Sequence, residues 1–258
     1  MPELPEVEAL LRTLRRQVEG RRIVSVEYLF PRAAGGDPRE MAERLEGRRI
    51  VRAGRHGKHL LFELDEGWMD VHLGMTGRLL VGSRLKPALR ARVVLDDGQT
   101  LEFEDVRQFG LLLWRADRPK LGPDALDITA EEFAERLRGR RGRIKALLLN
   151  QEFLAGVGNI YCDEALHRAR IHPLASRLGR ERAMRLHAAL VEVLSEAIEA
   201  GGSSISDYVD AEGRPGTFQE RHRVYGREGE ACFECGAAVK RMVVGQRGTH
   251  YCPRCQRR

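Results

Sequence analysis

The chain has 258 residues and a formal net charge of +6, with 44 Lys and Arg against 38 Asp and Glu. This length is enough for two domains and a small appendage, and the composition gives no sign of disorder. No apolar run approaches the roughly 20 residues of a membrane-spanning helix, and the first residues lack the apolar core of a signal peptide. We therefore expect a soluble intracellular protein.

Residues 1–8, Met-Pro-Glu-Leu-Pro-Glu-Val-Glu, begin a predicted helix. Pro5 suits the first helical turn, and Glu6 and Glu8 interact favourably with the positive end of the helix dipole. The apolar residues that follow recur at helical spacing and would hold one face of this helix against a core. They are Val7, Leu10, Leu11 and Leu14.

The same segment offers a nucleophile. An initiator Met before so small a residue as proline is normally removed, which leaves Pro2 with a free secondary amine. A terminal amine titrates at about pH 8 when unperturbed, so part of it is unprotonated at neutral pH, and Glu3 lies beside it as a proton carrier. The residues alone leave two interpretations open: a plain helix start, or a catalytic terminus that the helix holds still.

Short runs rich in β-branched and large apolar residues predict a series of strands after this helix. Turn sequences such as Asp65-Glu66-Gly67 and Asp96-Asp97-Gly98 separate several of them. Many closely spaced strands predict a β-sandwich or a barrel. The strands are expected at 22–29, 49–52, 59–64, 68–73, 78–81, 90–95, 100–103 and 111–114.

The apolar period then changes to that of helices, after a Pro- and Gly-containing linker. Helices are expected at 130–137, 144–150, 158–168 and 180–200, and a polar loop over 207–216 is long enough to be mobile and functional. We therefore predict an α+β multidomain chain. Its parts are an N-terminal domain at 1–115, a linker at 116–129, a helical domain at 130–220 and a C-terminal domain at 221–258.

Four cysteines near the C-terminus have the spacing of a zinc site. They form two pairs, Cys232 with Cys235 and Cys252 with Cys255, and 16 residues lie between Cys235 and Cys252. Disulfides are the alternative, but an intracellular chain lies in a reducing compartment, which favours one structural Zn²⁺. Strands at 240–244 and 249–251 would form a hairpin with its tip at 245–248, and the fifth cysteine, Cys162, is expected to be an inert buried thiol.

Two further features indicate a polyanion partner. Residues 221–258 contain nine basic and three acidic residues, so the whole net charge of +6 lies in this tail. The segment 155–161, Ala-Gly-Val-Gly-Asn-Ile-Tyr, lies between two predicted helices, and Asn159 with nearby backbone amides could hold a phosphate. A basic tail without function and a common glycine-rich connection are the plainer interpretations.

These features occur together, in one order, in a known family. The chain resembles the formamidopyrimidine-DNA glycosylases of bacterial base-excision repair from its first residue to its last. Besides the N-terminal segment, 156–161 and the four cysteines, the shared landmarks are 57–58, 72–77, 105–110, 121–123, 218–219 and 224–227. The resemblance implies an N-terminal β-sandwich, a helix-two-turn-helix domain and a C-terminal zinc finger, with DNA bound in the cleft between the domains.

The resemblance also implies roles for individual residues. Pro2 would attack C1′ of the damaged nucleotide, and Glu3 would move protons during sugar opening and elimination. Lys58 belongs to both the catalytic and the DNA-binding set, and with Asn159 and Arg247 it would hold phosphates around the lesion. The expected cofactor is one structural Zn²⁺ on the four cysteines, and the expected partner is double-stranded DNA with a damaged base or an abasic site, bound by a monomer.

A base buried in a duplex must be turned out of the stack before it can react. Met75, Arg107 and Phe109 match the residues with which the family fills the gap. Two neighbours depart from the family, because Val106 stands where proline is common and Gln108 where a second arginine is common. These departures make the preference for the partner base less secure than the chemistry.

The resemblance implies a bifunctional glycosylase and lyase for oxidised purines, formamidopyrimidine and 8-oxoguanine, that cuts the strand by β,δ-elimination. An endonuclease VIII-like enzyme for oxidised pyrimidines is the alternative with the same chemistry, and Leu4 favours the purine branch. A zinc-dependent protein that binds damaged DNA without catalysis is the alternative from another class. The expected location is the bacterial cytoplasm, at the nucleoid.

Overall fold

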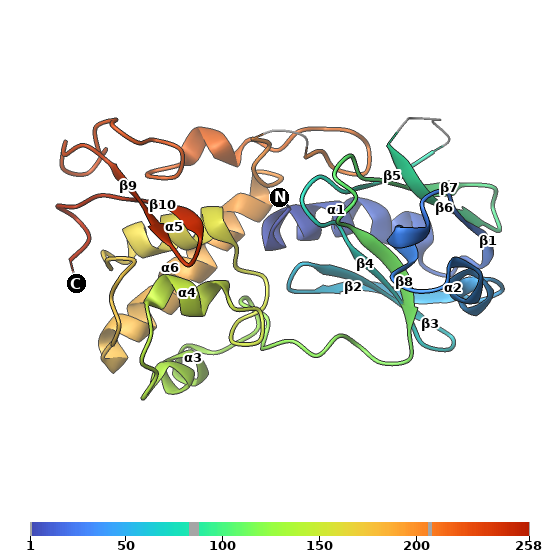
Figure 1. The fold of residues 1–258 in the computed structure, drawn as a ribbon, viewed down its shortest axis with the longest axis horizontal. Coiled ribbons are helices and arrows are strands. Elements are labelled where there is room, and N and C mark those ends of the chain that lie inside the picture. Colours follow the sequence, from blue (N-terminus) through green and yellow to red (C-terminus); the bar gives the residue numbers. More distant parts are fainter. Residues whose placement is uncertain (1, 83–87, 206–207, 258) are drawn as a thin grey trace. The chain divides into compact units, whose positions relative to one another are not determined.

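The computed structural model describes residues 2–82, 88–205 and 208–257, which form two compact units. Unit 1 comprises residues 1–119 and 198–217, and unit 2 comprises residues 120–197 and 218–258. Figure 1 shows that unit 1 holds most of the strands and unit 2 most of the helices. Among the described residues, no helix combines the length and apolar character that crossing a membrane requires.

Unit 1 is a sandwich of two four-stranded antiparallel sheets, which confirms the predicted sandwich (Figure 1). One sheet has the order β1-β6-β7-β5 and the other the order β2-β3-β4-β8. The strands are β1 (Ile23–Tyr28), β2 (Ile50–His56), β3 (His59–Leu64), β4 (Trp68–His72), β5 (Arg78–Val81), β6 (Leu89–Leu95), β7 (Thr100–Glu104) and β8 (Leu111–Arg115). Each of the eight predicted strands corresponds to one of these.

The core of unit 1 lies between the sheets and under the first helix, α1 (Leu4–Val18). Side chains of β6 alternate between buried and half-buried along the strand, as expected for one face turned to the core. The apolar face of α1 joins this core, and α1 packs against β2 and β3. The predicted apolar stripe of the first helix is therefore confirmed, and it fixes the chain's N-terminal residues to a rigid body.

One helix of unit 1 was not predicted. It is α2 (Pro38–Leu45), which follows a short 3-10 turn, η1 (Pro31–Ala34). Asp37 caps α2, since its side chain accepts a hydrogen bond from Arg39 N at 2.9 Å, and Pro38 occupies the first turn. The sequence Asp37-Pro38 is typical of a helix start. The helix was nevertheless not predicted, because only Leu45 of α2 is buried and its sequence therefore lacks a clear apolar period.

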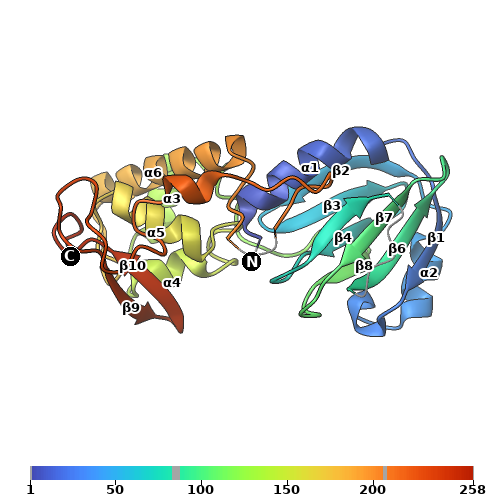
Figure 2. The same ribbon diagram turned by 90° about the horizontal axis from the view of Figure 1, so that it is seen from above.

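Unit 2 consists of helices and a C-terminal hairpin (Figure 2). The four predicted helices are present, and a short 3-10 turn, η2 (Phe218–Arg221), leads to the hairpin of β9 (Lys240–Val244) and β10 (Arg247–Tyr251). The helices are α3 (Ala130–Leu137), α4 (Ile144–Leu149), α5 (Asn159–Arg168) and α6 (Arg180–Glu199), of which α6 continues past the boundary of the unit.

The hairpin tip is shorter than predicted. Val244 pairs with Arg247, so the turn consists of Gly245 and Gln246 alone, and both have positive φ, of 55° and 61°. Two residues with positive φ form the tight turn that suits the twist of a hairpin. Arg247 and Gly248 are consequently strand residues with fixed backbone positions, and the expectation that they lie in the turn was wrong.

Candidate active site and nucleic-acid interface

The N-terminal residues of unit 1 are held by reciprocal hydrogen bonds. Glu3 is the N-cap of α1 and forms a capping box with Glu6, in which Glu3 N donates to Glu6 Oε2 at 2.7 Å. Pro2 and Glu3 are both buried, and the side chain of Glu3 is 1% exposed. Buried and hydrogen-bonded residues so near the start of a chain differ from the frayed ends of most chains.

Glu6 also binds a segment far away in the sequence. Its Oε1 accepts a hydrogen bond from Ser203 N at 2.7 Å, and its backbone oxygen accepts one from the Tyr208 hydroxyl at 2.9 Å. Gly202 has a φ of +85°, and a Cβ added there would lie 2.7 Å from Glu6 Oε1. Only glycine therefore fits. Sequence reasoning assigned Glu6 to the helix dipole alone and missed this second role.

Residues 208–216 of the predicted polar loop have neither helix nor strand, which agrees with the prediction, while Asp207 lies outside the described residues. The loop, which belongs to unit 1, is closed by its own hydrogen bonds, because Gly216 N donates to Ser204 Oγ at 2.9 Å and Ser204 Oγ donates to Tyr208 O at 2.7 Å. Its contacts with Glu6 make it a neighbour of the N-terminal residues.

Lys58 lies in the two-residue turn between β2 and β3. His56 pairs with His59 across this turn, and Gly57 has a φ of +57°, which glycine adopts without strain. Lys58 is half-buried. His59, which follows Lys58, is held by Asp70 of β4. His59 Nδ1 lies 2.8 Å from Asp70 Oδ1, and Arg115 Nε donates to Asp70 Oδ2 at 2.6 Å.

Burial and the charged groups near this turn shift the pKa of Asp70 and the pKa of His72. Burial alone would raise the pKa of Asp70, but the hydrogen bonds and positive charges of His59 and Arg115 together lower it. Burial, with the charges of His59 and Lys58, lowers the pKa of His72 to about 4, although Asp70 opposes the shift. His72 is consequently neutral at pH 7, and its Nδ1 accepts a hydrogen bond from Gly74 N at 3.3 Å.

That hydrogen bond orders the turn that carries Met75, and a buried carboxylate joins this turn to the next loop. Asp105 is 1% exposed and accepts hydrogen bonds from Thr76 Oγ1 and from the amides of Phe109 and Gly110, the last two at 2.7 Å. Arg107 N donates to Thr76 Oγ1 at 3.0 Å. Asp105 was noted only as part of a family landmark, although an Asp that begins a loop commonly binds the amides that follow it.

The loop fixed in this way presents its side chains outward. Phe109 is 50% exposed, Val106 is 68% exposed, and the guanidinium of Arg107 lies 5.3 Å from the centre of the Phe109 ring. Gln108 has a φ of 61°, which is unusual for a residue other than glycine. Met75 is half-buried. Both Met75 and Phe109 flank glycine-containing turns, which predicts exposed loop tips, and the prediction is confirmed for Phe109 and only in part for Met75. An exposed aromatic ring on a hydrogen-bonded loop suits contact with bases.

In unit 2, Asn159 is in direct contact with the first residues of β10. Asn159 begins α5, and its Nδ2 donates to Gly248 O at 2.9 Å, next to the exposed Arg247. The amide group of asparagine carries two donor hydrogens, so one remains for a ligand. The structure brings together two residues that the sequence places 88 positions apart, both expected to hold phosphates.

A buried ion pair beneath this contact was not predicted. Lys145 Nζ lies 2.6 Å from Asp163 Oδ1, and both side chains are 0% exposed. Lys145 Nζ also donates to Gly248 O at 3.2 Å, while Asp163 Oδ2 accepts from His250 N at 2.8 Å. The pair therefore joins α4 and α5 to β10, and it fixes the strand that carries Arg247.

The four cysteines form the expected metal site. Their sulfur atoms lie within 4.8 Å of one another, and the separations of Cys232 from Cys255 and of Cys235 from Cys252 are 3.9 Å and 3.4 Å. Tetrahedral zinc with bonds of about 2.3 Å places its sulfur ligands about 3.8 Å apart, so this donor set fits zinc. The thiols differ in their titration, because a hydrogen bond with the Ala237 backbone lowers the pKa of Cys235 to about 7, whereas burial raises the pKa of Cys252 and of Cys255.

Buried polar groups attach the zinc site to α5. His167 Nε2 lies 3.6 Å from Cys232 Sγ, and Glu164 accepts three backbone hydrogen bonds, from Arg223, Val224 and Tyr225, at 2.8 to 3.0 Å. The buried core around the metal is small: Val224, Cys232, Val239 and Cys252. Cys162 is fully buried in α5, as predicted, and does not belong to the metal site.

Three families described from other proteins match this chain in sequence. Residues 1–112 match the formamidopyrimidine-DNA glycosylase N-terminal domain, and residues 121–209 match the formamidopyrimidine-DNA glycosylase H2TH domain. Residues 229–258 match the zinc finger found in FPG and IleRS. A formamidopyrimidine-DNA glycosylase of Solibacter usitatus is 52% identical over 266 residues, with 100% of both chains covered.

Solved structures show the same similarity in three dimensions. The MutM (Fpg) protein of Thermus thermophilus is 46% identical and has a TM-score of 0.88, over 99% of this chain and 98% of that one. A variant of Lactococcus lactis Fpg in complex with Fapy-dG-containing DNA is 35% identical, with a TM-score of 0.91 over 100% of both chains. At 34% identity, one L. lactis structure contains abasic-site DNA and a MutM structure contains carbocyclic 8-oxo-G DNA.

Proposed function

Since the chain belongs to the formamidopyrimidine-DNA glycosylase family, we propose that it excises oxidised purines from duplex DNA and then cuts the strand at the abasic site. The observation that carries the proposal is the N-terminal segment, where Pro2 and Glu3 are buried and Glu3 is fixed to α1 by the capping box with Glu6. A protein that only bound damaged DNA would have no need of a rigid amine beside a carboxyl group.

The proposed nucleophile is the secondary amine of Pro2, freed by removal of Met1. Its lone pair forms a bond to C1′ as the bond from C1′ to the damaged base breaks, and the base leaves with a proton. Opening of the sugar ring breaks the bond from C1′ to the ring oxygen, which takes a proton, and yields an iminium ion between Pro2 and the opened sugar. The positive nitrogen then withdraws electrons during successive β- and δ-elimination of the two phosphates.

Glu3 is the proposed proton carrier. It is adjacent to Pro2 in the chain, and its buried position keeps its carboxyl group out of bulk water, as suits a group that transfers protons to or from a bound substrate. Glu6 holds the backbone of Glu3 in place and is a positioning residue in this scheme. Hydrolysis of the iminium ion by water returns the free amine and completes the cycle.

DNA binding is assigned to residues of both units. Lys58 of unit 1 and Asn159 and Arg247 of unit 2 are proposed to bind backbone phosphates, which position the duplex without reading its sequence. The fixed turn of Lys58 and the hydrogen bond from Asn159 to Gly248 O support these roles, because rigid donors lose little entropy on binding. Lys58 would also favour the unprotonated state of a nearby amine by charge repulsion.

Met75, Arg107 and Phe109 are proposed to occupy the space that a turned-out nucleotide leaves. Phe109 supplies an exposed aromatic surface for stacking, and the Arg107 guanidinium can donate hydrogen bonds to the unpaired base. The shared carboxylate of Asp105 keeps the Met75 turn and the 105–110 loop together, so that the three side chains can act as one group.

The zinc ion is proposed to have a structural role. Four cysteine ligands leave no open position for substrate, and the bound metal would hold the hairpin that presents Arg247. The proposed partner is damaged double-stranded DNA, and the proposed place of action is the nucleoid in the bacterial cytoplasm.

Strand scission on matched duplexes tests the proposal. We expect the parent protein to cut duplexes that contain 8-oxoguanine or formamidopyrimidine opposite cytosine faster than one with an oxidised pyrimidine. Glu3→Gln should lower the rate by about 10² to 10⁴, the contribution typical of a general acid or base. A higher rate on the oxidised pyrimidine would favour the endonuclease VIII-like alternative, while binding without scission of any duplex would favour a non-catalytic protein.

A further inference from the structure

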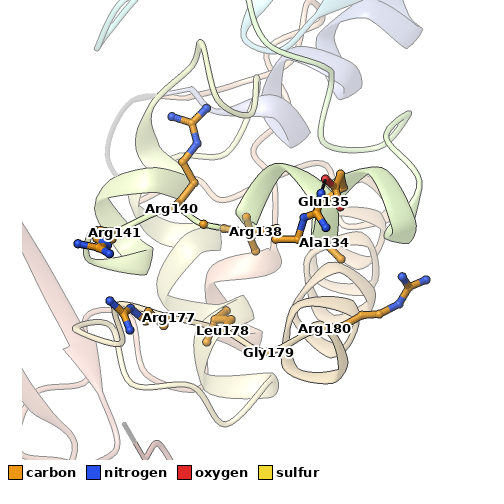
Figure 3. Close-up of a pocket in the computed structure, with 11 residues that line it drawn as sticks. Ala134, Glu135, Arg138, Arg140, Arg141, Arg177, Leu178, Gly179 and Arg180 are labelled. Atoms are coloured by element: carbon orange, nitrogen blue, oxygen red, sulfur yellow. Dashed lines mark ion pairs between the residues drawn. The ribbon is translucent and has the colours of Figure 1, made fainter.

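Unit 2 contains an arginine-lined pocket that none of the expected DNA-binding residues lines (Figure 3). The pocket has a volume of about 550 Å³ and lies between the end of α3, with the turn that follows it, and the loop that precedes α6. Its basic residues are Arg138, Arg140, Arg141, Arg177 and Arg180, and a single carboxylate, Glu135, lines it. The pocket is therefore strongly positive.

The charges in the pocket are only partly neutralised. Glu135 is engaged by Arg138 at 2.6 Å, and within the described ranges no ion pair involves Arg141, Arg177 or Arg180. Figure 3 shows the guanidinium groups of Arg141 and Arg177 on the same side of the pocket, whereas Arg140 and Arg180 point outward. Arginine stays protonated at all physiological pH values, so the pocket remains positively charged and would attract an anion.

The backbone around the pocket favours an anion as well. Gly139 turns the chain with a φ of +74°, which places arginines on both sides of the turn. Helix α6 has 20 residues and begins at Arg180, so the positive end of its dipole adds to the field of the pocket. Residues 136–151, which follow Glu135, contain five arginines and one lysine and no acidic residue, so this part of the chain adds only positive charge.

The chemistry of the pocket matches phosphate better than a protein partner. The planar guanidinium group binds phosphate oxygens through two parallel hydrogen bonds, and arginine is the usual residue for this recognition. A protein interface would be expected to centre on aromatic anchors, yet no aromatic residue lines this pocket. In both Figures 1 and 2, α3 lies apart from the β9–β10 hairpin, and neither Asn159 nor Arg247 lines the pocket.

We propose that this pocket binds backbone phosphates of duplex DNA that lies outside the lesion site. The inference rests on the proposed function in one respect, which is that the polyanion bound by the pocket is taken to be DNA. Its effect would be a second, sequence-independent contact that lengthens the time the protein spends on undamaged DNA. Either the flanking part of the lesion duplex or a separate duplex could supply these phosphates, since the chemistry is the same.

The test compares R141Q/R177Q with the control R32Q/R39Q, which removes two exposed arginines from unit 1. Binding of an undamaged 30-base-pair duplex is measured by fluorescence anisotropy at several salt concentrations. Loss of two phosphate contacts should lower the slope of log affinity against log salt by about 1.8, because each contact contributes about 0.9. The control should keep the parent's slope, and the number of duplexes bound per protein distinguishes flanking from separate DNA.

Scission of a short lesion duplex of about 12 base pairs is measured in parallel and should be the same for all three proteins. If no protein cuts this duplex, the proposed function fails while the binding comparison still decides the inference. Equal affinity and equal slope for R141Q/R177Q and the control would overturn the inference. Zinc content and circular dichroism verify the fold, and if the double variant does not fold, the single variant R141Q, with an expected slope change of about 0.9, decides instead.

Discussion

Glu6 and Ser203 are joined by a hydrogen bond of 2.7 Å between Ser203 N and Glu6 Oε1, while the other carboxylate oxygen of Glu6 accepts from Glu3 N at 2.7 Å. One buried carboxylate therefore holds both the N-terminal residues and the start of the 203–208 segment. A group that binds two donors with its two oxygens cannot be replaced by an amide without loss, because the amide nitrogen would face one of the donors.

Glu6→Gln is expected to lower strand scission by about tenfold to a hundredfold, since loss of one charge-assisted hydrogen bond costs about 1.5 to 3 kcal/mol and each 1.4 kcal/mol is a factor of ten. The variant should remain folded. The measurement is single-turnover scission, with Glu40→Gln on the exposed face of α2 as the control. An unchanged rate in Glu6→Gln would show that the terminus does not need this anchor.

The pH dependence of unit 1 should reflect His72. Folding lowers the pKa of His72 from 6.5 to about 4, so the folded protein favours the neutral imidazole. The free energy of unfolding is therefore highest above pH 6.5 and falls as the pH falls toward 4, because the unfolded chain then binds a proton that the folded chain does not. At most about 3 kcal/mol is involved, given 1.36 kcal/mol per pH unit. In His72→Gln, the free energy of unfolding should decline less between pH 7 and pH 4 than in the parent.

Trp68 and Trp114 are the only tryptophans in the sequence and both belong to unit 1, so tryptophan fluorescence follows the unfolding of this unit. Urea titrations at four pH values give the two profiles. Parallel profiles for the parent and His72→Gln would contradict the burial of a neutral His72 as the source of the pH dependence.

The ion pair of Lys145 and Asp163 should be costly to break. Lys145→Met leaves Asp163 buried without its partner, and such changes destabilise a protein by about 3 to 5 kcal/mol. Adding Asp163→Leu should recover part of the loss but not all of it, because His250 N then loses its acceptor. The exposed Lys120→Met serves as the control and should change stability by less than about 0.5 kcal/mol.

Urea unfolding followed by circular dichroism gives these free energies. Destabilisation of Lys145→Met no greater than that of Lys120→Met would contradict the role of the pair. The DNA affinity of the folded variant should also decline, since Gly248 O would lose the Lys145 donor that helps to fix the strand of Arg247.

Zinc removal should unfold the hairpin of unit 2. The buried core around the cysteines contains four residues, so the metal, which contributes on the order of 10 kcal/mol in such sites, supplies most of its stability. One zinc ion per chain is expected by elemental analysis. After chelation, the amides of Thr249 and Tyr251, which belong to the hydrogen-bonded pairs with Met242 and Lys240, should lose protection from hydrogen exchange, whereas tryptophan fluorescence of unit 1 should persist. Protected hairpin amides in metal-free protein would contradict this account.

Much of the fold could be predicted from periodicity. The strands of unit 1 and the four helices of unit 2 were predicted because their apolar patterns are regular. The metal site of Cys232, Cys235, Cys252 and Cys255 was predicted because the spacing within each cysteine pair is a local feature of the sequence. Helix α2 was missed because it buries one residue. The tip of the β9–β10 hairpin was predicted too long, since glycines at 245 and 248 both resemble turn residues and only Gly245 has positive φ.

The site was less predictable because its supports are long-range. Pro2 and Glu3 could be singled out from the chain's first residues, but nothing local shows that Glu6 binds Ser203 or that Lys145 pairs with Asp163. Asp105 is an intermediate case, as its bonds to Phe109 and Gly110 are local and its bond from Thr76 is not. Supports of this kind follow from packing, which only three-dimensional structure gives.

The most direct test of the central claim is borohydride trapping on a duplex with one 8-oxoguanine opposite cytosine. Reduction converts an iminium ion between the protein and C1′ into a stable covalent adduct. The mature protein is compared with a form that keeps one residue ahead of Pro2, in which the amine is an amide and has no free lone pair, and with Pro2→Gly. The account predicts an adduct, mapped to Pro2, from the mature protein and none from the extended form. An equal yield of adduct from the extended form would contradict the N-terminal amine as the nucleophile.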